Sequence, residues 1–179
     1  MRIEVVPYNK EWISIFEEER QILLHALPTL IREVHHIGST SVKGLAAKPI
    51  IDILLVVSSL SKLDSSIPVI EKLDYESMGE FGIRGRRYFR KGRLNRTHQI
   101  HAFRENDPNI IRHIVFRDYL ASNAEARVEY ENLKTLLAKT CDNDIERYCA
   151  GKDRFIKYHE ARALRLFEQA HDNRWNVDT

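Results

Sequence analysis

Hydrophobic positions near the N-terminus recur with helical spacing and then give way to strand-like runs. Pro7 and Asn9 precede an apolar stripe that ends near Pro28, a pattern that predicts an amphipathic helix. Residues 31–37 (IREVHHI) predict a short strand. After a loop rich in Gly, Ser and Thr, residues 50–57 (IIDILLVV) form a β-branched run that is typical of a strand buried on both faces.

The middle of the chain mixes helical and strand patterns. Residues 60–73 predict a helix that Pro68 interrupts, because proline lacks the N–H that an inner helical position donates. Residues 86–91 (RRYFRK) and 97–103 (THQIHAF) predict two strands with turn-forming residues between them.

The last third of the chain follows the helical period. Asp107 and Pro108 predict a helix start, with a cap followed by a proline in the first turn. Residues 122–125 (SNAE) predict a capping box that opens a second helix. Asp142 or Asp144 is expected to cap a long third helix.

The order of these elements predicts the fold class. It is α/β (α+β), with a mixed sheet flanked by helices and a C-terminal helical cap. A length of 179 residues fits a single domain. We therefore expect residues 1–105 to form the α/β core, residues 106–172 to form a helical part packed on the same domain, and residues 173–179 to form a frayed tail.

Composition and cysteine count narrow the class of protein. The longest apolar run, residues 50–57, contains Asp52 and is too short to span a bilayer. The N-terminus carries Glu4 and has no apolar stretch of the signal-peptide kind. The two cysteines, Cys141 and Cys149, cannot form a disulfide framework. We expect a reduced, cytoplasmic protein with no membrane partner.

Net charge does not identify a ligand, but its distribution is uneven. The 28 basic and 26 acidic residues leave a formal charge of +2. Residues 81–104 contain no acidic residue and several arginines. This segment is either a solvated hairpin balanced by acidic helices or a basic wall that faces phosphate or another anion, to which arginine can donate two parallel hydrogen bonds.

The stretch from His36 to Asp52 (HIGSTSVKGLAAKPIID) is the richest in candidate chemistry. Gly38 lets backbone N–H groups approach an anion, and Ser39 and Thr40 add hydroxyl donors, although such a turn is more often a helix cap. Asp52 lies within the apolar strand, where an ionised carboxylate is costly unless it binds a metal or finds donors. Its position therefore favours a functional role over a purely structural one.

At this point the sequence resembles a known family. The string GSTSVKGLAAKPIIDI is similar to the GrpB family, a branch of the nucleotidyltransferase superfamily. The similarity continues through GIRGRRYFR, RTHQIHAF, FRDYLASNAEARVEYENLK and ERYCAGKDRF. It covers roughly residues 6–158.

The resemblance implies a role for each matched residue. Gly38 and Ser39 would hold the β- and γ-phosphates of a nucleoside triphosphate, and Asp52 would bind Mg²⁺, which neutralises phosphate charge and orients the attack. Lys48 would pair with phosphate from the loop or simply face solvent. The strand arginines Arg86 and Arg90 are candidates to line the same cleft.

Two departures from the superfamily pattern concern the metal site. The second carboxylate expected two residues after Asp52 is replaced by Leu54. The strand at residues 97–103 corresponds to the one that carries the superfamily's third carboxylate, and here it reads His98-Gln99-Ile100-His101. Alternation along this strand directs His101 toward Asp52, with Gln99 in place of a second histidine. An Asp–His pair would suit Mn²⁺ or Zn²⁺ better than Mg²⁺, or His101 would act as a general base, or it is a histidine satisfied by its neighbours in a polar cleft.

Three hypotheses follow. The first is a nucleotidyltransferase that uses a nucleoside triphosphate and a divalent metal to modify an unknown acceptor. The alternative is a non-catalytic nucleotide- or anion-binding module that has lost the second metal carboxylate at Leu54. A third, weaker one is nucleic-acid binding through residues 84–96, with Tyr88, Phe89 and Phe103 as stacking surfaces. On the C-terminal helices, Tyr130 and Tyr148 are expected to pack, and Lys134 and Lys152 are candidate anion contacts.

Overall fold

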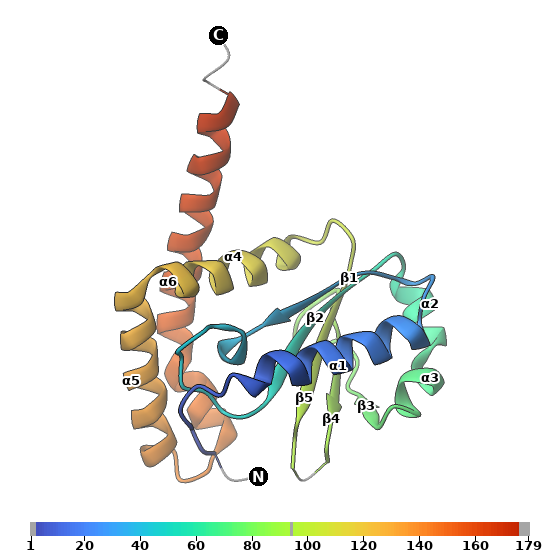
Figure 1. Cartoon of the computed structure of the whole chain (residues 1–179), viewed down its shortest axis with the longest axis horizontal. Coiled ribbons are helices and arrows are strands. Elements are labelled where there is room, and N and C mark those ends of the chain that lie inside the picture. The colour runs from blue at the N-terminus through green and yellow to red at the C-terminus, as the bar shows by residue number, and fades with distance from the viewer. Residues whose placement is uncertain (1–2, 94, 176–179) are drawn as a thin grey trace.

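A computed structural model gives the fold for residues 3–93 and 95–175, with a five-stranded mixed sheet at its centre (Figure 1). The elements in chain order are α1 (Glu11–Ala26), β1 (Ile31–Ile37), the 3-10 helix η1 (Ser39–Ser41), β2 (Ile51–Val57), α2 (Leu60–Ser65), α3 (Ile67–Glu71), β3 (Tyr75–Ser77), β4 (Arg87–Lys91), β5 (His98–Arg104), α4 (Pro108–Ser122), α5 (Ala124–Thr140) and α6 (Ile145–Trp175). The predicted mixed sheet with flanking helices and a C-terminal helical part is confirmed. Within these ranges, no helix combines the length and apolarity needed to cross a bilayer.

The strand order is β1-β2-β5-β4-β3. β2 and β5 pair in parallel, and the other neighbours pair antiparallel. β2 therefore lies inside the sheet, hydrogen-bonded on both sides. The expected burial of both its faces is confirmed, since every residue of β2 except Asp52 is buried. Asp52 is the one polar side chain that this inner strand carries.

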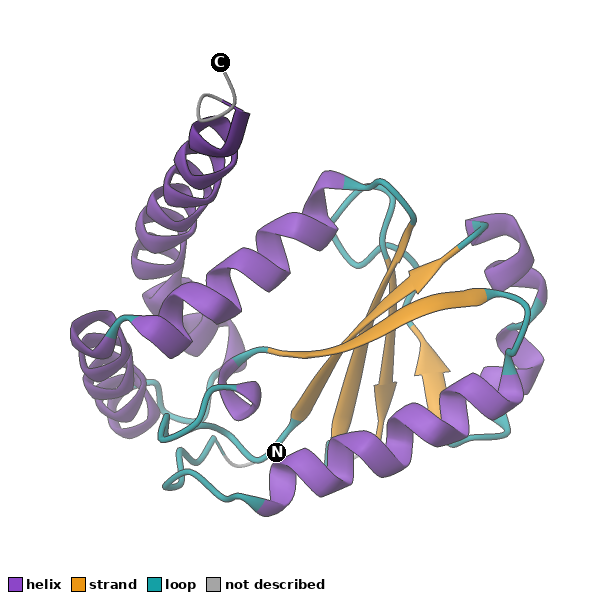
Figure 2. Cartoon of the chain, turned by 45° about the horizontal axis from the view of Figure 1, so that its top comes forward, coloured by secondary structure: helices purple, strands orange, loops and turns teal. Residues whose placement is uncertain are grey.

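One face of the sheet is the main hydrophobic core. α1, α2 and α3 lie against it (Figures 1 and 2). Trp12 and Leu23 of α1 pack with Ile53 of β2 and with Phe89 and Ile100 of the neighbouring strands. Full burial of each such side chain contributes roughly 1.5–3 kcal/mol, so this face holds the sheet rigid.

The opposite face of the sheet is divided. Over one part, Leu54 and Phe103 pack with Ile110 and Ile114 of α4. Over the rest, polar side chains such as Asp52 and Gln99 line a cleft. α5 and α6 run side by side next to this half of the molecule, and the last turns of α6 extend beyond it (Figure 1). The rigid sheet thus presents one half of its second face as the wall of a site.

The ends of the C-terminal helices agree only in part with the predicted caps. Asp107 caps α4 and Asp144 caps α6, each accepting backbone N–H groups of the first turn. The capping box predicted from Ser122 is wrong. Ser122 is the last residue of α4 and donates back to the Asp118 carbonyl at 2.8 Å, whereas Asn123 caps α5 by accepting from Ala126 N at 3.0 Å. Asparagine caps as well as serine does, and the Ser122 hydroxyl is already bonded to carbonyl oxygens of α4.

The expected tail falls partly on described residues. α6 runs to Trp175, so the tail predicted to begin at residue 173 starts within this helix. Residues 176–179 lie outside the described part of the chain.

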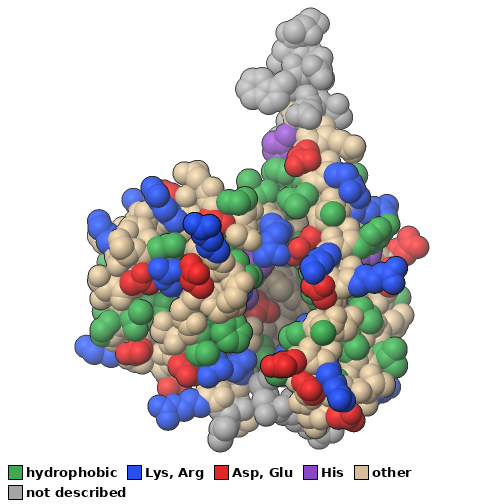
Figure 3. All heavy atoms as spheres, turned by 180° about the vertical axis from the view of Figure 1, so that it is seen from behind, with side chains coloured by type: hydrophobic (Ala, Val, Ile, Leu, Met, Phe, Trp, Pro, Cys, Tyr) green, Lys and Arg blue, Asp and Glu red, His purple; other side chains and the backbone are tan. Residues whose placement is uncertain are grey.

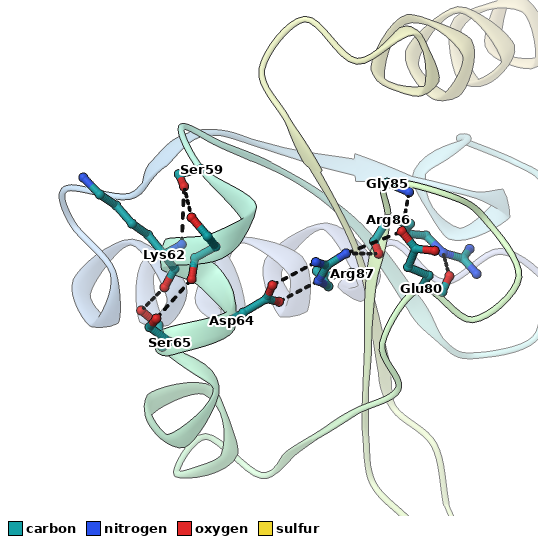
Figure 4. A network of polar contacts seen from close by, with 10 residues as sticks. Ser59, Lys62, Asp64, Ser65, Glu80, Gly85, Arg86 and Arg87 are labelled. Carbon is teal, nitrogen blue, oxygen red and sulfur yellow. Dashed lines mark hydrogen bonds and ion pairs between the residues drawn. The ribbon is translucent and has the colours of Figure 1, made fainter.

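β3 and the loop that joins it to β4 have no counterpart in the predicted elements. Polar contacts within the loop and at the start of β4 fix its conformation (Figure 4). Arg87 donates two hydrogen bonds to Asp64, at 2.6 and 2.8 Å, and these bonds lower the pKa of Asp64. Glu80 accepts from the Gly85 N–H at 2.7 Å. The loop therefore has a fixed conformation, and its residue Phe81 lines the cleft.

Candidate functional site

A cleft of about 520 Å³ lies between the open part of the sheet face and the helices α5 and α6. Figure 3 shows it as a hollow between the two halves of the molecule, with charged side chains on its rims. Its lining comes from both halves: Gly38, Ser39, Thr40, Ala47, Lys48, Ile50, Asp52, Phe81, Tyr88, Arg90, Arg96 and Gln99 from the sheet half, and Tyr130, Lys134, Ile145, Glu146, Tyr148, Cys149 and Lys152 from the helices. Most of the predicted site residues are thus brought together.

Gly38 and Asp52 are packed directly against each other. Gly38 follows the last residue of β1, and Ile37 pairs with Asp52 across the strands. Its φ of 70° and ψ of −172° belong to a region that essentially only glycine occupies. A Cβ at Gly38 would lie 3.0 Å from the Asp52 Cβ and closer still to its carboxylate. The turn can adopt this form beside the carboxylate only because residue 38 is glycine.

Asp52 is at the centre of a row of residues that crosses the sheet. The register pairs Ile37 with Asp52, Asp52 with Gln99, and Gln99 with Arg90. The Asp52 side chain is 27% exposed and opens into the cleft. The turn at Gly38 lies at one end of this row, and Arg90 lies at the other.

His101 approaches Asp52, as alternation along the strand predicts. Its Nε2 lies 3.7 Å from the Asp52 Oδ1. On the other side of the ring, Arg86 donates to Nδ1 at 3.3 Å. A guanidinium can only donate, so Nδ1 is an acceptor and the ring proton is on Nε2, facing Asp52. Both a metal ligand and a general base need a free ring nitrogen, and this tautomer places the free lone pair against Arg86. The described geometry therefore favours the histidine satisfied by its neighbours.

Arg86 does not line the cleft. It is 6% exposed and donates to two carbonyl oxygens of the β3–β4 loop, Glu80 at 3.2 Å and Phe81 at 2.6 Å. Burial lowers its pKa. The predicted phosphate contact does not fit this position, because the guanidinium holds the loop and the His101 ring.

Thr40 is at the cleft but its hydroxyl is already engaged. It is 1% exposed, donates to the Ile50 carbonyl oxygen at 3.3 Å and lies 3.0 Å from the His36 Nε2. Burial lowers the pKa of His36 to about 4, so the ring is neutral at physiological pH and donates to Thr40. Thr40 thus ties the turn to the loop before β2, whereas the Ser39 hydroxyl lies at the cleft, hydrogen-bonded to Tyr130.

Two lysines of the cleft lie over one tyrosine ring. Lys48 Nζ is 5.0 Å and Lys152 Nζ is 4.4 Å from the centroid of the Tyr148 ring. Burial lowers the pKa of both lysines, and neighbouring cations lower each further, Arg96 for Lys48 and Lys48 for Lys152. An anion bound between them would relieve this repulsion, which is the behaviour expected of a phosphate site.

A third lysine, Lys134, is almost completely buried at 2% exposure. Its Nζ donates to the Ala46 carbonyl oxygen and lies 4.6 Å from the centroid of the Tyr130 ring. Glu131 accepts from the Ala46 N–H at 3.0 Å. Burial lowers the pKa of Lys134 to about 7, with a further contribution from Lys152. α5 therefore clamps the loop that carries Lys48.

Arg90 lines the cleft as predicted, held by a 2.6 Å hydrogen bond from its Nε to Glu76. Arg96 of the same segment also lines the cleft, but the rest of the expected basic wall is interrupted. Arg87 is paired with Asp64 and Arg86 with loop carbonyls. Two of the three predicted stacking surfaces, Phe89 and Phe103, are 1% and 0% exposed in the core.

The residues around Asp52 fit one hard cation shared with a ligand. Leu54 is fully buried under α4 and faces no cleft. Within residues 3–93 and 95–175, no three His, Cys, Asp or Glu side chains gather in a way that could hold a metal. The described residues therefore do not form a Zn²⁺ or Mn²⁺ site made of three or more such side chains. Mg²⁺ is commonly held by one or two carboxylates together with substrate phosphates, and Asp52 can supply that one carboxylate.

The sequence predicted Tyr130 and Tyr148 as packing residues only; both are buried, and both also line the cleft. Each is followed four positions later by a cleft lysine, Lys134 on α5 and Lys152 on α6. Positions four apart share a helix face, so this repeated Tyr-x-x-x-Lys spacing was the available signal. Phe81 carried no such signal, because it lies in a loop that the pattern left undefined.

Comparison with known proteins agrees with the family signature. The family model described as GrpB protein matches residues 2–162. UPF0157 protein YqkA of Bacillus subtilis is 41% identical over 164 residues, which cover 92% of this chain and 48% of YqkA, so the chain spans about half of that relative. Glutamate-rich protein GrpB of Alkalihalophilus pseudofirmus is 32% identical over 157 residues, 85% of this chain and 90% of that protein.

Solved structures give the same result. The crystal structure of conserved protein GrpB from Enterococcus faecalis superposes with a TM-score of 0.88 at 44% identity, covering 92% of this chain and 99% of that one. The poly(U) polymerase Cid1 bound to MgATP reaches a TM-score of only 0.49 at 14% identity, a level from which no shared fold is inferred. The five ordered motifs, the family match over residues 2–162 and the shared fold lead to one conclusion: the chain belongs to the GrpB family.

Proposed function

We propose that the cleft binds a nucleoside triphosphate with one divalent cation and transfers its nucleotidyl group to an acceptor hydroxyl. The observation that carries this proposal is the contact between Gly38 and Asp52. A turn that only glycine can form, with its backbone open to an anion, is packed against the one carboxylate of an inner strand. Phosphate and metal would be held at the same point, which is what nucleotidyl transfer requires.

The charge of the cleft supports a highly charged anion as the ligand. Five basic side chains line it, Lys48, Arg90, Arg96, Lys134 and Lys152, against the two acidic side chains Asp52 and Glu146. A cleft lined mainly by one sign of charge concentrates ligands of the opposite sign. A triphosphate fits this excess better than a single phosphate does.

The roles of the chain's residues follow from their positions. The turn at Gly38 and Ser39 and the lysines over Tyr148 would hold the β- and γ-phosphates, leaving the α-phosphate near Asp52. Oxygen of the acceptor hydroxyl would bond to the α-phosphorus, the bond to the bridging oxygen would break, and pyrophosphate would leave while the hydroxyl proton passes to water. A divalent cation bound at Asp52 would neutralise phosphate charge and orient the leaving group.

A second candidate function has its own observation. Leu54 removes the second carboxylate and is buried under α4, so the described residues offer a single acidic ligand. A protein that only binds the nucleotide or another polyphosphate needs the turn and the lysines but no metal pair. In this reading the same cleft is a non-catalytic anion-binding module.

Titration calorimetry with the four ribonucleoside triphosphates, with and without Mg²⁺ or Mn²⁺, distinguishes the two. We expect metal-dependent binding that Asp52→Asn weakens at least tenfold. Pyrophosphate release is then measured with acceptors that carry hydroxyl groups, RNA among them. Equal binding and turnover by Asp52→Asn would contradict the transferase. Binding without metal dependence or pyrophosphate release would establish the binding module.

Gly38→Ala tests the turn, with Gly44→Ala as its matched control. Both glycines have positive φ, 70° and 81°, but a Cβ at Gly44 would meet nothing within 4 Å. Each change should cost about 1–3 kcal/mol of stability for the backbone conformation. Only Gly38→Ala should also displace Asp52 and abolish metal-dependent binding. Loss of binding in both variants would show that the contact with Asp52 is not what matters.

A further inference from the structure

We propose that Phe81 is the platform on which the base of the bound nucleotide stacks. This inference rests on the proposed function, and it names the part of the cleft that distinguishes a nucleotide from a bare polyphosphate. Phe81 lines the cleft and is 57% exposed, so it presents an apolar ring surface beside a polar site.

The Phe81 ring is held in place from behind. It is stacked on Tyr88, with centroids 5.0 Å apart and planes 14° from parallel, so one face is covered and the other is open. Tyr88 itself is 5% exposed, and the Arg86 guanidinium lies 5.0 Å from its ring centroid. The support under Phe81 is therefore a buried aromatic side chain that is itself packed.

The backbone of Phe81 is fixed as well. Its φ is 45°, a conformation that a bulky residue adopts only at a cost of about 1–3 kcal/mol. Its carbonyl oxygen accepts a 2.6 Å hydrogen bond from the buried Arg86. A strained residue that keeps an aromatic ring at the rim of a cleft is suited to binding, because preorganised rings bind with little loss of entropy.

The register of the sheet places this ring at the opposite end of the cleft from the phosphate turn. Gly38 adjoins β1 on one side of Asp52, whereas Tyr88 and Arg90 lie on β4, two strands away on the other side. Two strand spacings are about 10 Å. Triphosphate at the Gly38 turn and base at Phe81 would thus lie on either side of Asp52, with the ribose spanning the distance between them.

The chemistry of the open face suits a nucleobase. Aromatic stacking on a base contributes about 1–3 kcal/mol by alanine substitution and tolerates every base, because each has a π-face. Gln99, in the row between Asp52 and Arg90, is the neighbouring uncharged group that can both donate and accept a hydrogen bond. We therefore expect stacking to set affinity for the base, with modest selectivity among bases.

The test compares ATP with inorganic tripolyphosphate, both with Mg²⁺, by titration calorimetry. Phe81→Ala should weaken ATP binding about tenfold and leave tripolyphosphate binding unchanged. Phe81→Trp should restore or tighten ATP binding. Tyr158→Ala is the control, since Tyr158 is an aromatic residue of matching 59% exposure on α6 that does not line the cleft. It should bind both ligands like the wild type.

Each remaining outcome is decisive. Unchanged ATP binding by Phe81→Ala would overturn the platform and leave the polyphosphate site intact. Equal weakening of ATP and tripolyphosphate binding, with no recovery of ATP binding in Phe81→Trp, would also overturn the platform. It would indicate that the substitution disturbs the whole cleft. A wild-type protein that binds neither ligand would overturn the proposed function and this inference together.

Discussion

Lys134 shows how one buried charge can couple ligand binding to pH. Burial lowers its pKa to about 7 in the folded protein, against about 10.5 in an unfolded chain. Near neutrality the amine is therefore only partly charged. An anion in the cleft favours the charged form, so it would raise this pKa and take up a proton on binding.

The expected result is a polyphosphate affinity that is greatest below pH 7 and falls as pH rises above it. The fall should approach tenfold per pH unit for one linked proton and should flatten in Lys134→Met. Calorimetry in two buffers of different ionisation enthalpy measures the proton uptake directly. Equal enthalpies in both buffers at pH 8 would contradict the linkage.

The lowered pKa of Lys134 also makes the free energy of unfolding depend on pH, in a direction that can be worked out. Between about pH 7 and 10.5 the unfolded chain binds the proton that folded Lys134 has released, so stability rises with pH in this window. The slope is at most about 1.4 kcal/mol per pH unit, and it is absent below the folded pKa and above the unfolded one.

For single residues, the sequence predicted roles that depend on the surrounding segment. It missed roles that depend on contacts with loops elsewhere in the fold. Gly38 was predicted from the turn that its segment indicates, and Asp52 from its place in an apolar strand. The engagement of Arg86 and Thr40 depends on the carbonyls of Phe81 and Ile50, which only the folded loops bring near. No spacing in the sequence carries that information.

At the scale of elements, a buried ion pair ties helix α1 to strand β4. Glu19 is 4% exposed, and Lys91 Nζ lies 3.1 and 2.9 Å from its two carboxylate oxygens. Lys91→Met would leave that carboxylate buried without its cation, a loss of about 3 kcal/mol. The double variant Glu19→Gln, Lys91→Met should recover most of it. Urea denaturation measures both.

A matched exposed pair is the control. Asp153 and Lys157 on α6 are 2.6 Å apart, with side chains 54% and 73% exposed. Lys157→Met should change stability very little, because solvent screens exposed pairs. If Lys91→Met were equally mild, the pair between α1 and β4 would have no role in holding the helix on the sheet.

Element types were largely predictable, and element boundaries were less so. Sequence patterns located α1, β1, β2 and β5 to within a residue or two, because each is a short segment of regular or strongly apolar pattern bounded by turn-forming residues. β3 has three residues and only Tyr75 is buried, too short for any period to appear. Its existence depends on pairing with β4, a tertiary contact.

At the scale of the whole molecule, the two halves that form the cleft are firmly connected. Val42 and Leu45, from the loop after the turn at Gly38, are buried among the side chains of α4, α5 and α6. Arg117 of α4 donates to the His36 carbonyl oxygen of β1 at 3.1 Å. This loop therefore packs into the core of the helical half, and it also carries Lys48, which lines the cleft.

This connection predicts one cooperative unfolding transition that the ligand shifts as a whole. Tripolyphosphate at a hundred times its dissociation constant should stabilise the protein by about 2.7 kcal/mol and raise Tm by roughly 5–10 °C. Sodium chloride of equal ionic strength is the control for screening. Calorimetry combined with near-UV dichroism follows the aromatic residues of both halves. Two transitions, with only one shifted by the ligand, would show that the halves unfold separately and that the cleft closes on one of them alone.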